Sequence, residues 1–291
     1  WENLGEDANG NGHTIIYSGG QYILDPGDLN GIDDDNWDNN ASTYIDDLVG
    51  FEVSGGSYGD NDPNPPSSGW GWSHGTHVAG LLSATTNNNT GIASTAFNCS
   101  ILPVKCTADN EDNNYISNGF EGMLYAAQAG YNAEGFVIIN CSWGGLGSNI
   151  FEQASINTMH NNYNSVIFAA AGNDNIEQAH YPSSYDNVIS VTALGSNGSW
   201  NHWATYHESV DLGSPGENIR STTISNYQSW DGTSMASPVA ASCAGLLKSF
   251  NPNWDNNQIE TMILATADPV IYDINPENYL ENKLGKGRVD M

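Results

Sequence analysis

Residues 166–174 read VIFAAAGND, a run of six apolar residues that ends in a glycine, an asparagine and an aspartate. A run that is apolar throughout is typical of a strand buried on both faces of a parallel sheet. The runs FVIINC (136–141) and VISVTA (188–193) have the same character. Helical patterns occur between or after them, at 116–127, 151–163, 234–250 and 255–267. This alternation predicts an α/β fold in which a mostly parallel sheet lies between layers of helices.

Weaker patterns extend this organisation toward the N-terminus. We expect strands at 44–53 and 101–104, and a helix at 78–84 that follows a His-Gly-Thr-His turn. We find no internal repeat and no linker, so we expect one domain over 1–291. Within it, the acidic Asn/Asp/Gly-rich residues 1–65 are predicted to be an insertion, and 66–291 to be the core.

The composition excludes several classes of function. The 291 residues contain 34 Asp and Glu against 6 Lys and Arg, a formal net charge of −28. Nucleic-acid binding needs clustered Lys and Arg, so we expect no nucleic-acid partner. The apolar runs are far shorter than the ~20 residues that cross a bilayer, so we expect no membrane span. Each of the four cysteines lies in an apolar run, which favours buried free thiols, although one disulfide is possible.

Three segments contain the parts that nucleophilic catalysis needs. GWSHGTHVAG places His74 beside a glycine where a helix begins, and SWDGTSMASPVAA places Ser234 at the start of another helix. Asn173 follows an apolar strand, at the edge where parallel α/β sheets bind ligands. A serine nucleophile needs a base within hydrogen-bond reach and a donor for the oxyanion, and His74 and Asn173 would supply them. Alone, each residue is more often structural; His77, three residues later, is expected to pack within its helix rather than bind zinc.

The order and spacing of HGTHVAG, AAAGN and GTSMASP resemble those of the subtilisin-like serine proteases. The segments GIASTAFNCSILPVKC, VIINCSWGG, VDLGSPGENIRST and LGKGRVDM are similar to further parts of that family, so the resemblance covers about residues 44–291. It implies a subtilisin-like fold and a serine endopeptidase. It also implies that Ser234 attacks the peptide carbonyl, that His74 transfers the proton, and that Asn173 and the backbone N–H of Ser234 form the oxyanion hole.

The resemblance further implies where a peptide or protein substrate would bind. Ser142, Trp143 and Gly144 would pair with its backbone and shape the pocket for the residue before the cleaved bond. Trp143 stands where the family usually has a smaller apolar residue. Gly172 precedes the oxyanion-hole asparagine, and His180 falls near the wall of the same pocket. A large or polar residue there would disfavour bulky apolar side chains, and the alternative for His180 is an ordinary surface loop.

The third member of such a triad is missing from its expected place. The family's aspartate stands in an Asp-Thr-Gly or Asp-Ser-Gly at the end of the first strand, and neither motif occurs before His74. Asp25 in LDPGD is the nearest imitation, but a proline replaces the small hydroxyl residue. We expect the aspartate upstream of Trp1, outside this sequence. The alternative is a catalytically silent domain that serves in binding or scaffolding.

The first 62 residues contain 14 carboxylates and no Lys or Arg. Asp-x-Asn-x-Asn-Gly at 7–12 has the first half of a calcium loop, and later acids would complete one or more sites. We therefore predict a structural calcium ion bound by residues among Asp7, Asn9, Asn11, Asp25, Asp28, Asp33 and Asp35. The alternatives are a solvated acidic surface or a calcium-dependent adhesion module, which would not explain the three spaced motifs.

Acidity and calcium favour an extracellular or cell-surface location. The combined hypothesis is a calcium-stabilised, secreted endopeptidase. A pro-segment or an inhibitor is a further expected partner.

Overall fold

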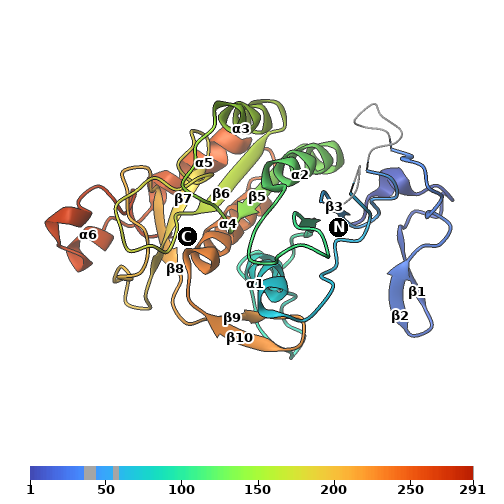
Figure 1. Cartoon of the computed structure of the whole chain (residues 1–291), viewed down its shortest axis with the longest axis horizontal. Coiled ribbons are helices and arrows are strands. Elements are labelled where there is room, and N and C mark those ends of the chain that lie inside the picture. Colours follow the sequence, from blue (N-terminus) through green and yellow to red (C-terminus); the bar gives the residue numbers. More distant parts are fainter. Residues whose placement is uncertain (36–43, 55–58, 291) are drawn as a thin grey trace. The chain divides into compact units, whose positions relative to one another are not determined.

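The computed structural model of the chain describes residues 1–35, 44–54 and 59–290 (Figure 1). It consists of two units. One comprises Trp1–Trp72 and Ser100–Gly135, and the other comprises Ser73–Cys99 and Phe136–Met291. All three motif segments contribute their chemistry-bearing residues to the second unit.

A four-stranded sheet is the centre of the second unit. Its strands are β5 (Val137–Cys141), β6 (Ser165–Ala170), β7 (Ile189–Leu194) and β8 (Leu212–Pro215). They lie in the order β5-β6-β7-β8, and each neighbouring pair is parallel. Every residue of β6 and β7 is buried, which is the environment that their apolar sequences predict.

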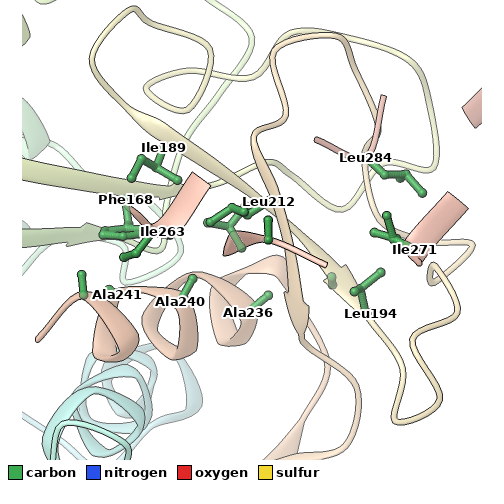
Figure 2. Packing of buried hydrophobic residues seen from close by; sticks show 14 of the residues in the cluster. Phe168, Ile189, Leu194, Leu212, Ala236, Ala240, Ala241, Ile263, Ile271 and Leu284 are labelled. Atoms are coloured by element: carbon green, nitrogen blue, oxygen red, sulfur yellow. The ribbon is translucent and has the colours of Figure 1, made fainter. Parts of the chain in front are cut away.

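Helices flank this sheet (Figure 1). Helix α4 (Thr233–Phe250) packs against all four strands, while α3 (Ile150–Asn162) and α5 (Asn256–Thr266) contact β6. Ala236, Ala240 and Ala241 of α4 are buried in the same cluster as Phe168 of β6 (Figure 2). Alanine side chains allow a helix to approach a sheet closely, and such dense packing leaves few voids. The predicted α/β class with helices around a parallel sheet is confirmed.

Helix α1 extends further than its sequence pattern predicts. It runs over Trp70–Ser83, so the His-Gly-Thr-His segment lies inside the helix, and the expected turn at that segment is wrong. One interior glycine costs a helix roughly 1 kcal/mol, which tertiary contacts can offset. Such contacts come from the antiparallel hairpin of β9 (Ile219–Thr222) and β10 (Tyr227–Trp230). Ser221 and Thr222 donate hydrogen bonds to the carbonyls of His77 and Thr76, at 2.6 and 2.9 Å.

The first unit contains several short elements, one longer helix and a small aromatic core. They are η1 (Leu4–Glu6), the antiparallel strands β1 (Ile15–Ser18) and β2 (Gln21–Leu24), the parallel strands β3 (Phe51–Glu52) and β4 (Val104–Lys105), and α2 (Gly119–Glu134). Tyr44, Phe51 and Tyr125 pack in one cluster, with ring centroids 4.8–5.7 Å apart. The last two elements in the sequence belong to the second unit and are α6 (Ile271–Ile274) and η2 (Asn278–Leu280).

Two predicted strands are shorter than expected. The run 44–53 is extended only at Phe51–Glu52, because Tyr44 and Asp46 take positive φ values of 55° and 54°, which turn the chain. The run 101–104 becomes the two-residue strand β4, which begins after Pro103, a residue without a backbone N–H.

The four cysteines are free, and two of them, Cys141 and Cys243, are buried as predicted. Cys106 is half-buried. Cys99 is exposed, contrary to expectation, because it lies in a turn closed by its N–H on the carbonyl of Ala96. In the part of the chain that the structure describes, no helix has the length and apolar character that a membrane crossing requires.

Candidate active site

Helix α1 carries two histidines one turn apart, on the same side of the helix. The ring of His77 is fully buried and stacks on the indole of Trp230, with centroids 4.3 Å apart and planes at 11°. Its Nε2 lies 3.1 Å from the carbonyl oxygen of Gln228. These contacts fit the predicted packing role. The ring of His74 lies nearly parallel to the same indole, with centroids 6.4 Å apart.

Trp230 precedes Ser234 by four residues, so this indole connects α1 with the chain that enters α4. Ser234 is the second residue of α4. Its Oγ donates to the carbonyl of Ser142 at 3.2 Å, and Ser142 Oγ donates to the carbonyl of Ser234 at 2.8 Å. This reciprocal pair fixes the first turn of α4 against the chain that leaves β5.

A second layer of polar side chains supports that pair. Asn140 Nδ2 donates to Ser142 Oγ at 2.9 Å, and Ser237 Oγ donates to Asn140 Oδ1 at 2.7 Å. Ser237 is one turn along α4 from Ser234, so the network returns to the same helix. Such side-chain networks restrict the rotamers of their members.

The side chain of Asn173 has a defined orientation. Its Oδ1 accepts hydrogen bonds from the backbone N–H of Thr233 at 2.9 Å and from Thr233 Oγ1 at 3.0 Å. Thr233 Oγ1 in turn accepts the N–H of Gly172 at 3.2 Å. Since a backbone N–H can only donate, the amide oxygen must face Thr233, and the amide N–H groups must face the other way. Asn173 is thus anchored to Thr233, the neighbour of Ser234 in sequence, and its amide N–H groups point away from Thr233.

Two glycines make close contacts with His180. A Cβ at Gly144 would lie 2.4 Å from His180 Cε1, and one at Gly172 would lie 3.1 Å from His180 Cδ2. Gly172 also has a φ of +105°, which other residues rarely adopt. Gly145 and Tyr181 exchange two backbone hydrogen bonds of 2.8 and 2.7 Å, which hold the two chain segments together. The structure therefore groups Gly144, Gly172 and His180, and the half-buried Trp143 adjoins them in sequence.

Burial makes all three histidines of this region weaker bases. Burial, together with a smaller contribution from the charge of His77, lowers the pKa of His74 to about 4. Burial also lowers the pKa of His77 and of His180. The rings are therefore neutral near pH 7, the state in which an imidazole can accept a proton.

The predicted calcium-binding residues fall into separate contacts in the first unit. The side-chain amides of Asn9 and Asn11 donate to Asp25 Oδ2 at 3.1 and 2.6 Å, and the N–H of Asn9 donates to Asp28 Oδ1 at 3.1 Å. Asp7 Oδ1 accepts the N–H of Asn11 at 3.0 Å. Hydrogen bonds from Gly27 and Asn9 lower the pKa of Asp25. These five residues close a loop mainly by bonding to one another.

Asp35 belongs to a different cluster, with Glu6 and Asp47. One carboxylate oxygen of each lies within 4.8 Å of the others. Burial raises the pKa of Glu6 to about 7 and that of Asp47 to about 8, and the carboxylate of Asp35 contributes to both shifts. Asp33 is also buried, and its charge adds to the shift of Glu6. Sequence reasoning missed Glu6 and Asp47, because 41 residues separate them.

Sequence reasoning also missed Trp230 and Thr233. The dipeptide Trp230-Asp231 stands directly before the GTSMASP motif, but nothing in it reveals stacking on a histidine 153 residues earlier. Thr233 lies within the motif, and its two donors define the orientation of Asn173.

Several known proteins are similar in sequence to this chain. A model of the subtilase family matches residues 29–287. Thermitase from Thermoactinomyces vulgaris is 40% identical over 225 residues, which are 77% of this chain and 76% of that protein. The halolysin-like extracellular serine protease Nep of Natrialba magadii is 33% identical over 79% of this chain, which spans only 40% of that relative.

A solved structure has a similar fold. A protease from Pseudoalteromonas arctica PAMC 21717 superposes with a TM-score of 0.67 and 26% identity, over 84% of this chain and 81% of that one. These relatives support a serine protease function. The family match covers most of the chain, and the chain belongs to the subtilase family.

Proposed function

We propose that this chain is a serine endopeptidase in which Ser234 is the nucleophile, His74 the general base, and Asn173 an oxyanion donor. The observation that carries the proposal is the pair of hydrogen bonds from Thr233 to Asn173 Oδ1. They turn the amide N–H groups of Asn173 away from Thr233, beside the N-terminus of α4. Donors that are oriented before the reaction stabilise a developing oxyanion without reorganisation.

Each step uses groups of this chain. Ser234 Oγ forms a bond to the peptide carbonyl carbon while its proton passes to His74, and the carbonyl oxygen becomes an oxyanion. Asn173 and the N–H of Ser234 donate to that oxygen. His74 then gives the proton to the leaving amine as the peptide bond breaks. Water, deprotonated by His74, releases the acyl group and restores Ser234.

A catalytically silent binding domain is the second candidate. The observation that favours it is the low pKa of His74, which burial lowers to about 4. A carboxylate beside the ring would favour the imidazolium and counter that shift. In serine proteases with such a triad, losing the acid lowers turnover by roughly 10⁴.

A fluorophosphonate probe separates the two candidates. An activated serine displaces fluoride from phosphorus, and the intact mass then rises by one adduct. We expect one adduct on the parent chain and none on Ser234→Ala. Ser249→Ala, which removes an exposed serine of the same helix, is the matched control and should give one adduct. No adduct on a folded parent chain would favour the silent domain.

We further propose that Ser142, Trp143 and Gly144 pair with the substrate backbone, and that Gly172 and His180 help to line the pocket for the residue before the cleaved bond. The ring contacts of His180 with the positions of Gly144 and Gly172 support a narrow, polar pocket. Peptides with Ala or Ser before the cleaved bond should have a higher kcat/KM than those with Phe. His180→Ala should reduce this preference, measured as kcat/KM for the Ala or Ser peptide divided by kcat/KM for the Phe peptide. An unchanged preference would mean that His180 does not line the pocket.

The family match runs across both units, which supports one peptidase domain with an acidic insertion at 1–65. We propose a structural calcium ion in that insertion, since carboxylate and carbonyl oxygens are the ligands calcium prefers. The high negative charge and the extracellular relative support action outside the cell on peptide or protein substrates, with a pro-segment or inhibitor as a further partner.

A further inference from the structure

Asn173 is exposed, just beyond the end of β6. The chain leaves that strand through Gly172, whose φ of +105° ends the extended conformation. The hydrogen bonds from Thr233 orient the amide side chain of Asn173. An amide is placed only as well as the backbone that carries it, so the backbone contacts of residues 172–174 bear directly on the candidate oxyanion donor.

Thr205 contacts the backbone on both sides of Asn173. Its N–H donates to the carbonyl of Gly172 at 2.9 Å, and its Oγ1 accepts the N–H of Asp174 at 3.2 Å. These atoms belong to the two planar peptide groups that flank the Cα of Asn173. One residue therefore restricts both backbone torsions of Asn173.

Thr205 is itself held firmly. It is 1% exposed, and its carbonyl accepts the hydroxyl of Thr192, in β7, at 2.9 Å. The segment of Thr205 also bonds the chain beyond Asn173, since the N–H of Asn175 donates to the carbonyl of Trp203 at 3.0 Å. Strand β7 is paired with β6, so these contacts connect the loop that carries Asn173 to the buried sheet.

The hydroxyl of Thr205 lies against the bend at Gly172. A Cβ at Gly172 would be only 2.9 Å from Thr205 Oγ1. Burying a hydroxyl costs free energy unless it is hydrogen-bonded, and valine would fill the same space without that cost. The bond from Asp174 therefore gives the hydroxyl a role that packing alone does not require.

We propose that Thr205 is a positioning residue for peptide cleavage, which holds the backbone of Asn173 so that its amide meets the oxyanion. The inference rests on the proposed function and adds a residue to it. Thr233 orients the side chain of Asn173, whereas Thr205 fixes the peptide groups on either side of it. A donor that is held in place before the reaction needs no reorganisation when the oxyanion forms.

Steady-state kinetics of the full chain on one peptide substrate test the role of Thr205. Thr205→Val should lower kcat by about tenfold and change KM by less than about twofold, because the donor acts mainly in the transition state. Thr205→Ser keeps the acceptor oxygen and should retain the parent kcat. Thr205→Ala removes the same oxygen without adding a methyl group, and covers the case in which valine prevents folding.

Ser165→Ala is the matched control. Ser165 is fully buried at the other end of β6, and its Oγ donates to the carbonyl of Tyr163 at 3.3 Å. Its loss also removes a buried hydroxyl from the second unit, but it should leave kcat unchanged.

A double-mutant cycle separates positioning from a general structural role. If Thr205 acts through Asn173, Thr205→Val should change kcat by less than about twofold in an Asn173→Ala background. The same tenfold loss in both backgrounds would overturn the inference, and so would a loss confined to KM.

Amide hydrogen exchange, followed by NMR, gives a readout that does not depend on catalysis. In a Ser234→Ala background, which prevents self-digestion, Thr205→Val should speed exchange at the N–H of Asp174 several-fold, and Thr205→Ser should not. An unchanged rate in Thr205→Val would overturn the anchoring.

Fluorophosphonate labelling of the parent tests the nucleophile separately. A labelled parent whose kcat does not depend on Thr205 would overturn this inference and leave the proposed function standing. An unlabelled parent would overturn the proposed function and the catalytic part of this inference together, and the exchange rates would still decide whether Thr205 anchors residues 172–174.

Discussion

Thr233 holds Asn173, the candidate oxyanion donor, by two hydrogen bonds to the same oxygen, Asn173 Oδ1. Its backbone N–H and its Oγ1 both bond to Asn173 Oδ1, and its Oγ1 also accepts the N–H of Gly172. A hydroxyl side chain is needed for this, because it donates and accepts at once. Valine has the same shape and can do neither.

We expect Thr233→Val to lower kcat by about tenfold with little change in KM, because the amide of Asn173 loses one of its two anchors. Asn173→Ala should cost roughly 10²–10³ in kcat, a figure taken from a member of this same family. Thr233→Ser keeps both bonds and serves as the control. Steady-state kinetics on one peptide substrate measure all three. A change confined to KM would contradict a role in the transition state.

Asp211 gives a pH dependence at the residue scale. Burial raises its pKa to about 6, although the N–H of Ser190 donates to its Oδ2 at 2.8 Å. The folded state therefore keeps this proton to a higher pH than the unfolded chain does. The contribution of protonated Asp211 to the free energy of unfolding is complete below pH 4 and is lost as pH rises through about 6. About two pKa units correspond to about 3 kcal/mol.

We expect Asp211→Asn to become more stable relative to the parent as pH rises from 4 to 7, by up to about 3 kcal/mol. Urea unfolding at several pH values measures the difference between the two proteins. Asp273→Asn, at an exposed position, should show no such trend. A parallel pair of curves for parent and Asp211→Asn would contradict a buried acid with a raised pKa.

The sequence identifies catalytic candidates better than their supports. His74, Asn173 and Ser234 stand in motifs whose residue types and order are themselves informative. Trp230 and Thr233 act through stacking and hydrogen bonding that become visible only in three dimensions. The positions of Glu6 and Asp47 depend likewise on how the acidic loops fold.

At the scale of elements, buried segments are predicted well and exposed ones poorly. Helix α4 was expected at 234–250 and occupies Thr233–Phe250, and β6 and β7 match their apolar runs within one or two residues. The β9–β10 hairpin had no signal, because its strands are partly exposed and lack a regular apolar alternation. Tertiary contacts, not local propensity, form such strands.

The start of α5 was predicted from Asp255 and is a capping box. Asp255 accepts the N–H of Gln258 at 2.9 Å, and the Gln258 side chain accepts the N–H of Asp255 at 3.0 Å. Asp255→Ala should lower the free energy of unfolding by about 1 kcal/mol. Asp255→Asn keeps an acceptor and should cost less than half as much. Chemical denaturation measures the free energy of unfolding of both variants. An equal decrease in the two would mean that the side-chain oxygen of Asp255 does not provide the stabilisation.

At the scale of the whole molecule, charge is the dominant feature. A net charge of −28 at pH 7 destabilises the folded state through self-repulsion. The charge is also unevenly distributed along the chain, since the first unit contains nineteen carboxylates and a single lysine. The second unit, with its alanine-rich helix on a parallel sheet, depends instead on apolar packing.

Salt should therefore stabilise this protein, and most strongly when calcium is absent. Ions screen charges beyond about 10 Å at 0.1 M and about 3 Å at 1 M. We expect Tm in chelator to rise steadily from 0.05 to 1 M NaCl, and to rise less when calcium already neutralises part of the acidic unit. Potassium chloride should act equally, because screening depends on ionic strength and not on the ion. A Tm that falls with salt, or one that responds equally with and without calcium, would show that repulsion among these carboxylates does not limit the stability of the fold.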